Sequence, residues 1–282
     1  MRHLQPSNEF SDPNFSIPIP GAEVLPGVCW GSTSLIFSPA YWKFVCTMNA
    51  MQDNESSFRI GETLREEIVA CLLGGHGVSG ELSNAAFHHL KRTGILNEKP
   101  ASQSRIEAAL RAPLKFGDRS IRYRYPKQKA RFISASLFIF DSATYIPLEP
   151  QELRGWLTTM PGIGLKTASW IVRNWLGADC VAILDIHIHR AGVIMGLFSP
   201  KDDIGTSYLD MEARFVALAE ALGIAASTLD NQIWSELRRV PATVRTRLKN
   251  LGITENDRCG LPPRKSKSRR SVSEKAQLSL VD

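Results

Sequence analysis

The stretch LTTMPGIGLKTASWIVR, at residues 157–173, decides the fold that we predict for this chain. We interpret it as the end of one helix, a four-residue hairpin and the start of a second helix. A residue that precedes proline disfavours the α conformation, so the first helix should close at Met160–Pro161. Gly162 and Gly164 then let the backbone turn tightly and approach a partner closely, because glycine has no Cβ atom. The stretch therefore predicts a helix-hairpin-helix unit.

The second helix of this unit begins with an isolated lysine, Lys166. Apolar side chains follow it at helical spacing, and Gly177 is a suitable helix end. These apolar residues are Ala168, Ile171, Val172 and Trp175. A helix N-terminus behind two glycines presents unpaired N–H groups, which suit a phosphate. On position alone, Lys166 fits a phosphate contact as well as it fits a nucleophile.

The composition is that of an ordinary globular protein, and 282 residues are enough for one or two domains. No apolar run approaches the roughly 20 residues of a membrane helix, and Met1–Phe10 lacks the apolar region of a signal peptide. The five cysteines are widely scattered and include no CxxC pair, which favours free thiols and argues against a zinc site. We therefore expect a cytoplasmic, nucleoid-associated protein without a membrane partner or a metal.

The net charge of +6 is unevenly distributed. Residues 258–282 carry seven Lys or Arg side chains against Glu274 and Asp282, so most of the excess charge lies there. With its prolines and serines, this segment predicts a disordered basic tail that attracts polyanions without specificity. Residues 1–57 are rich in proline, asparagine and serine before an aromatic stretch, and we expect an arm packed on the body.

The body between these segments, residues 58–257, predicts a mainly α domain, since helical spacing dominates and few segments alternate with a period of two. Within it, residues 111–131 hold eight Lys or Arg side chains interleaved with aromatic ones. Such a mixture suits phosphate contacts and stacking on bases, and it predicts a local nucleic-acid-binding patch. The alternative is a solvated loop and helix face.

Residues 157–173, followed by ILDIH at residues 183–187, resemble the helix-hairpin-helix/Gly-Pro-Asp superfamily of DNA base-excision glycosylases. In that superfamily, a lysine directly after the hairpin marks the bifunctional glycosylase/lyases. The Asp-x-His pattern at Asp185 and the 19-residue step from Lys166 to Asp185 are similar to the 8-oxoguanine glycosylase group. Looser similarity extends over about residues 58–250. The resemblance implies a mainly α fold of two subdomains with the active-site cleft between them.

The resemblance gives Lys166 and Asp185 catalytic roles, and chemistry explains why these residue types are needed. Cleavage of an N-glycosidic bond develops positive charge on the deoxyribose, which an ionised carboxylate stabilises. Asp185 would supply this carboxylate; the alternative is a simple helix cap. An amine attacks the same carbon only when it is unprotonated, and burial near other cations favours that form. Lys166 would attack, form a Schiff base and nick the strand by β-elimination.

Further residues are candidates for holding the DNA backbone. They are Gly162, Ile163 and Gly164 of the hairpin, and His187, Arg124, Lys129 and Arg131 outside it. For His187, a buried structural histidine is an equally good interpretation.

The target base must leave the stack to reach Lys166. Trp170 lies four residues further along the same helix face and is expected to form one wall of the base pocket. Trp234 and Asp230 are candidates for a second wall and for a hydrogen-bonding partner of the purine edge, with core packing the alternative for Trp234. His76, in a glycine-rich loop, is a candidate to fill the gap that the base leaves.

Two departures from the family limit what the resemblance implies. The long members carry a β-rich N-terminal domain, for which segment 1–57 is too short, so the short prokaryotic type or a divergent branch is favoured. The iron–sulfur relatives need four closely spaced cysteines near the C-terminus, and only Cys259 lies there, so we expect no cluster and no other cofactor.

The expected function is removal of an oxidised purine, 8-oxoguanine foremost, from double-stranded DNA by a monomeric enzyme with lyase activity. Two alternatives stay open. One is a glycosylase of the same fold for another modified base, for example in anti-phage defence. The other is a non-catalytic DNA-binding subunit.

Overall fold

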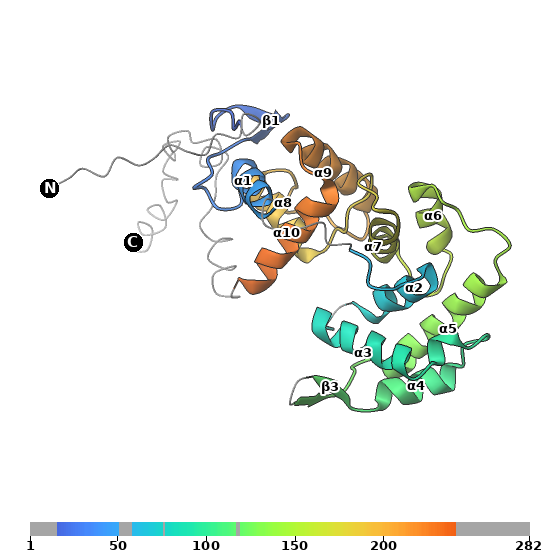
Figure 1. The fold of residues 1–282 in the computed structure, drawn as a ribbon. Coiled ribbons are helices and arrows are strands. Elements are labelled where there is room, and N and C mark those ends of the chain that lie inside the picture. The colour runs from blue at the N-terminus through green and yellow to red at the C-terminus, as the bar shows by residue number, and fades with distance from the viewer. Residues whose placement is uncertain (1–15, 51–57, 76, 117–118, 241–282) are drawn as a thin grey trace, which may run out of the picture.

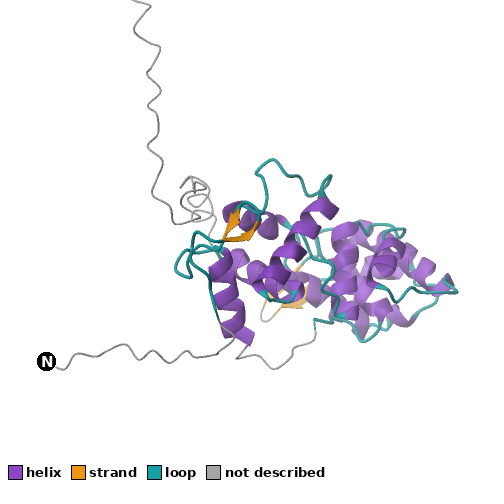
Figure 2. Cartoon of the chain, turned by 90° about the horizontal axis from the view of Figure 1, so that it is seen from above, coloured by secondary structure: helices purple, strands orange, loops and turns teal. Residues whose placement is uncertain are grey.

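The computed structural model describes residues 16–50, 58–75, 77–116 and 119–240 (Figure 1). Within these ranges, helices form nearly all of the regular structure, and only two short antiparallel hairpins accompany them (Figure 2). The mainly α fold predicted from the sequence is thus confirmed. No helix in the described ranges is long and apolar enough to cross a membrane. The predicted basic tail at 258–282 and the gap-filling candidate His76 lie outside the described residues.

The helices surround two hydrophobic cores. The first core is built from residues 64–181, and the second from residues 28–46 together with residues 182–237. Figure 1 shows α7 (Leu165–Leu176) between the two groups of helices. The chain leaves the first core at Val181 and enters the second at Ala182. This crossing lies immediately before Asp185, so the predicted catalytic aspartate stands at the junction of the two subdomains.

The first core is centred on α2 (Leu64–Leu73), of which every residue except Glu66 is buried. Its neighbours in space are α3 (Gly80–Arg92), α5 (Pro126–Ser142) and α7. The subdomain is completed by η1 (Ile95–Asn97), α4 (Gln103–Arg111), the hairpin of β3 (Leu114–Phe116) and β4 (Arg119–Ile121), and α6 (Pro150–Leu157). Thr63, Ser79 and Ser102 cap α2, α3 and α4 by accepting a backbone N–H, so local sequence sets these helix starts.

The hairpin joins α6 to α7. Helix α6 ends at Leu157, three residues before the predicted end. Thr158 and Thr159 turn the chain early, because their hydroxyls donate to carbonyls of the last helical turn. Backbone bonds from Met160 N–H and Ile163 N–H then close the turn, and α7 runs to Gly177 as predicted.

The two hairpin glycines have different reasons to be glycine. Gly162 has a φ of +84°, and a Cβ atom there would collide with the ring of Phe132 on α5. Gly164 has a φ of −95°, which any residue adopts, and a Cβ atom there would meet nothing within 4 Å. The turn itself therefore requires only Gly162, and the surface at Gly164 is open to a molecule outside the protein.

The second core contains β1 (Glu23–Leu25), β2 (Val28–Cys29), α1 (Pro39–Ala50), α8 (Ile186–Met195), α9 (Tyr208–Leu222) and α10 (Ala226–Arg239). Trp42 of α1 is fully buried and stacks on Phe37. The Tyr41 hydroxyl donates to Glu236 of α10 at 2.6 Å. Residues 28–46 therefore belong to the second core.

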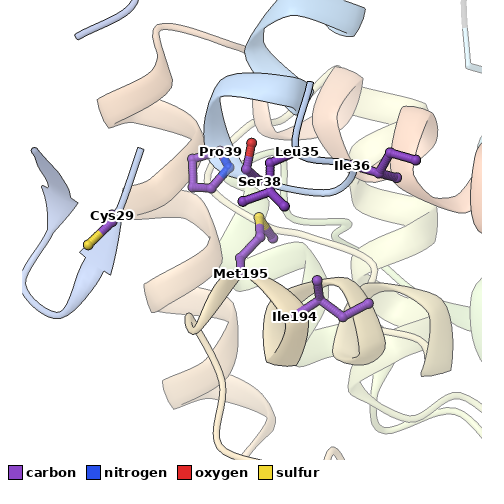
Figure 3. Close-up of a pocket in the computed structure, with 7 residues that line it drawn as sticks. All are labelled: Cys29, Leu35, Ile36, Ser38, Pro39, Ile194 and Met195. Atoms are coloured by element: carbon purple, nitrogen blue, oxygen red, sulfur yellow. The ribbon is translucent and has the colours of Figure 1, made fainter. Parts of the chain in front are cut away.

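The cysteines differ in their bonding, and one of them lines a small apolar pocket. Cys46, Cys71 and Cys180 are free, but Cys29 is disulfide-bonded, so the prediction of free thiols throughout is wrong at Cys29. The pocket in Figure 3 lies between Cys29, the start of α1 at Pro39 and the end of α8 at Met195. Its volume of about 10 Å³ has room for one water molecule, which excludes it as a base-binding site.

Candidate active site

Lys166 is the second residue of α7 and is half-buried. Its ammonium group takes part in no hydrogen bond or ion pair with the other described residues. The N-cap of α7 is Gly164, which has no side chain to satisfy the first N–H groups of the helix. The lysine and the N–H groups of this turn are therefore both available to a bound molecule.

A second lysine, Lys129 of α5, lies close to Lys166. Its ammonium donates to the carbonyls of Leu72 and Gly74, at 2.5 and 2.7 Å, and so satisfies the C-terminal end of α2. Burial lowers the pKa of Lys129, and the nearby charge of Lys166 lowers it further. We had predicted Lys129 as a DNA-backbone contact, but its ammonium is instead used within the protein.

Asp185 is the N-cap of α8. Its Oδ1 atom accepts from the N–H groups of His187 and Ile188, at 2.7 and 3.0 Å. Both bonds use the same oxygen, so Oδ2 remains for a substrate. Asp185 therefore caps α8 through Oδ1, as the helix-cap alternative expects. Its Oδ2 atom accepts no hydrogen bond from another described residue. His187 is half-buried in the first turn of the same helix, and both interpretations of its role stay open.

Asp230 was expected to contact the purine edge, and its position contradicts that expectation. The side chain is buried at 2% exposure, where Oδ1 pairs with Arg173 at 2.5 Å and Oδ2 accepts from Ile183 N–H at 3.2 Å. Burial raises the pKa of Asp230 to about 7, although Arg173 and the Ile183 amide oppose this rise. Both oxygens are occupied inside the protein, so Asp230 supports the backbone before Asp185.

The two tryptophans predicted to form the base pocket lie at the two ends of one glycine-rich loop, residues 74–80. A Cβ atom at Gly74 would come within 2.8 Å of the Trp170 ring, and one at Gly80 within 3.7 Å of the Trp234 ring. Both rings are half-buried, and the Arg238 guanidinium stacks on Trp234 at 4.4 Å. Trp170, which is on the Lys166 face of α7, thus packs against the first residue of the loop, and Trp234 on α10 packs against the last.

The basic patch divides into exposed and buried parts. Arg131 is exposed and stacks on Phe132 at 5.1 Å, and Phe132 packs against Gly162, so Arg131 lies beside the hairpin. Arg124 is exposed and lies against Gly77 of the glycine-rich loop. Tyr123 is buried, and its hydroxyl donates to the Leu73 carbonyl, so it is no stacking platform. The described cationic surface thus borders the hairpin and the loop.

A larger cavity opens beside this loop. It has a volume of about 270 Å³ and is lined by Gly75, Val78, Tyr125, Gln128 and Lys129. This volume is near the lower end of the range for small-molecule pockets, about 300 Å³.

Among the described residues, no group of three or more His, Cys, Asp or Glu side chains could hold a metal ion.

Sequence inspection missed three buried polar residues that support the site: Arg154, Arg173 and Glu212. Arg154 pairs with Glu212, and Arg173 pairs with Asp230. Each charge lies within an apolar helical stripe, as Arg173 does after Ile171 and Val172. A charge at a core position of an amphipathic helix is the signal that could have found them, because such residues are rarely buried unless paired.

The chain matches one known protein family. The family model described as 8-oxoguanine DNA glycosylase matches residues 48–224, which is more than half of the chain. The chain belongs to this family. The matched range includes the hairpin, Lys166 and Asp185, and it begins inside α1.

Individual relatives agree with the family assignment. An 8-oxoguanine DNA glycosylase/AP lyase of Metallosphaera sedula is 32% identical over 116 residues, which make up 40% of this chain and 57% of that protein. The match thus spans little more than half of that relative. The crystal structure of the 8-oxoguanine DNA glycosylase of Thermotoga maritima is similar with a TM-score of 0.54 and 25% identity, over 71% of this chain and 94% of that one. The enzyme of Methanocaldococcus jannaschii shares the fold, with a TM-score of 0.55 and 20% identity over 71% and 93%.

Proposed function

We propose that this chain removes an oxidised purine, 8-oxoguanine foremost, from double-stranded DNA and cleaves the strand through Lys166. The observation that carries the proposal is the placement of two groups in a member of the 8-oxoguanine glycosylase family. Lys166 stands at the start of α7 directly behind the hairpin, and Asp185 stands at the start of α8 with one oxygen unused. A lysine and a carboxylate at helix starts are the two groups that glycosylase/lyase chemistry requires.

The hairpin and its neighbours would hold the DNA backbone. The N–H groups at the start of α7 point out of an uncapped helix end and suit one phosphate. Arg131, beside the hairpin, would contact a neighbouring phosphate, and Arg124 would do so at the glycine-rich loop. Such contacts fix the register of the protein on the duplex without reading its sequence.

The two glycines of the hairpin make this model testable. Gly162→Ala is expected to lower the free energy of unfolding by about 1–2 kcal/mol from the left-handed backbone alone, with a further loss from the collision with Phe132. Gly164→Ala is the matched control: it should leave stability unchanged and weaken DNA binding, because its methyl group projects into open space. Denaturant unfolding and titration with a labelled duplex measure the two effects. Equal stability of the two variants would contradict the assigned roles.

Base excision would use both catalytic groups. The Lys166 amine forms a bond with C1′ of the sugar while the bond between C1′ and the purine nitrogen breaks. The electron pair leaves with the purine, which takes up a proton. The Asp185 carboxylate stabilises the positive charge that develops on the sugar as this bond breaks.

Strand cleavage would follow from the covalent intermediate. The bond between C1′ and O4′ breaks, O4′ takes up a proton from water, and C1′ and the Lys166 nitrogen form a protonated Schiff base. Loss of a proton from C2′ then expels the phosphate oxygen at C3′, which breaks the strand. Water finally hydrolyses the Schiff base and restores the amine.

The extruded purine would lie against Trp170, which shares a helix face with Lys166 and is half-buried against Gly74. Trp234 reaches the other end of the same loop and would close the pocket. An aromatic wall favours a flat base by stacking and reads little of its edge. The pocket wall thus supports a base substrate more strongly than it supports one particular lesion.

One panel of duplexes tests the proposal. The protein is incubated with duplexes that carry 8-oxoguanine, other oxidised or alkylated bases, or a modified base foreign to bacterial DNA, and borohydride is added to trap a Schiff base. We expect a trapped complex with 8-oxoguanine and little or none with the others. Trapping only with a foreign modified base would replace the substrate, and binding without excision of any base would support a non-catalytic subunit.

A further inference from the structure

In the backbone immediately before Asp185, the N–H groups are satisfied by side chains. Residues 182–184 belong to no helix or sheet, although Ala182 and Leu184 are fully buried. Buried backbone N–H groups need partners. Here all three come from side chains of α9 and α10, and we call Glu212, Asp230 and Tyr208 the clamp.

The first clamp residue, Glu212 of α9, bonds to residues of both subdomains. Oε1 accepts from Ala182 N–H at 3.0 Å and from the Ser169 hydroxyl of α7 at 3.2 Å. Oε2 pairs with Arg154 of α6. The carboxylate is 4% exposed and lies on the second core, whereas Arg154 and Ser169 belong to helices of the first.

The second clamp residue, Asp230 of α10, also bonds to residues of both subdomains. One oxygen accepts from Ile183 N–H, and the other pairs with Arg173 of α7, the helix that carries Lys166. Arg173 also donates to the side chain of Asn174. Asn174 in turn donates to Glu67 of α2 at 2.7 Å. A buried polar chain thus ties α2 and α7 to the segment that ends at Asp185.

Tyr208 of α9 completes the clamp. Its hydroxyl accepts from Leu184 N–H at 3.3 Å and donates to the Ala182 carbonyl at 2.7 Å. The three residues therefore hold each N–H of residues 182–184. Two of them are fixed in turn by arginines of the helices on either side of the hairpin.

We infer that Glu212, Asp230 and Tyr208 are positioning residues that set where Asp185 stands relative to Lys166. The inference rests on the proposed function, in which these two groups act on one sugar. The clamp acts where the chain crosses between the two cores. A shift of residues 182–184 would therefore move Asp185, whereas Lys166 is held by α7. A displacement of about 1 Å in a catalytic group costs on the order of 10²-fold in rate.

Two clamp variants test this inference against a matched control. Asp230→Asn and Tyr208→Phe loosen the clamp, whereas Asp141→Asn alters a carboxylate of α5 that pairs with Arg65 of α2 and has no bond to the clamp among the described residues. We expect the clamp variants to lower single-turnover base excision about 10–100-fold. Trapping on a preformed abasic site needs Lys166 but no glycosidic cleavage, and it should fall much less. Asp141→Asn should change both reactions in parallel with its melting temperature.

A double variant separates positioning from general destabilisation. If Asp230 acts through Asp185, adding Asp230→Asn to Asp185→Asn should cause little further loss of excision. Losses that multiply in the double variant, or equal losses of excision and abasic trapping, would overturn the inference.

A measurement without substrate tests the clamp separately from the proposed function. Hydrogen exchange of a peptide that covers residues 180–188 should be about 10-fold or more faster in both clamp variants, and unchanged in Asp141→Asn. Unchanged exchange in the clamp variants would refute the clamp even if the wild-type protein excises 8-oxoguanine. A wild-type protein that excises no base would instead refute the proposed function, whatever the exchange shows.

Discussion

Lys166→Gln is expected to abolish borohydride trapping and to lower base excision at least about 10³-fold, equivalent to roughly 4 kcal/mol of transition-state stabilisation. The substitution removes the nucleophile and breaks no hydrogen bond or ion pair of the described fold, since the ammonium forms none with another described residue. DNA affinity should change little, because the hairpin N–H groups and Arg131 remain. Single-turnover excision, trapping and duplex titration measure the three quantities.

The sharpest control for this experiment is the neighbouring lysine. Lys129 has a lowered pKa and lies close to Lys166, so it is the one rival amine that the described site suggests. Its three protons are largely committed, since it donates to the Leu72 and Gly74 carbonyls. Lys129→Gln should therefore still be trapped, although more slowly because the end of α2 loses its partner. Loss of trapping in Lys129→Gln and its retention in Lys166→Gln would exchange the roles of the two residues.

The parts of this site that sequence predicted are those set by local backbone chemistry. Gly162 has the left-handed conformation that a tight turn needs, and Gly177 ends α7 in the same conformation. Asp185 caps the helix that begins after it. Each of these assignments depends on a few neighbouring residues, so short-range rules were sufficient.

The partners that the sequence did not reveal are distant in the chain. Asp230 was assigned to the base pocket because nothing in its own helix shows that Arg173, 57 residues earlier, pairs with it. Lys129 was assigned to DNA, although the C-terminal carbonyls of α2, more than 50 residues earlier, accept its protons. The sequence around a polar residue on a helix does not show whether its side chain faces solvent or a buried partner. Only the fold distinguishes the two cases.

The same limit applies to the substrate. Trp170 was predicted as a pocket wall from its spacing to Lys166, and that spacing is local. The contact that shapes its surface is with Gly74, at the end of α2, where any side chain larger than hydrogen would meet the indole. The size of the pocket is therefore set jointly by α7 and the glycine-rich loop. A comparison of base preferences should vary Trp170 and this loop together.

Asp185→Asn is the second decisive variant, because asparagine caps a helix about as well as aspartate does. The Oδ1 bonds to the His187 and Ile188 amides can be kept, so stability should hold while the negative charge is lost. We expect base excision to fall about 10²–10³-fold, the usual cost of removing one preorganised electrostatic group. Asp185→Ala provides the contrast, since it should lose the same activity and in addition about 1 kcal/mol of stability through the missing cap. If Asp185 were only a cap, Asp185→Asn would excise at the wild-type rate, and Asp185→Ala would lose activity only as far as it unfolds. Excision rates and thermal unfolding of the two variants, measured side by side, therefore decide between a carboxylate that stabilises the sugar and one that merely starts α8.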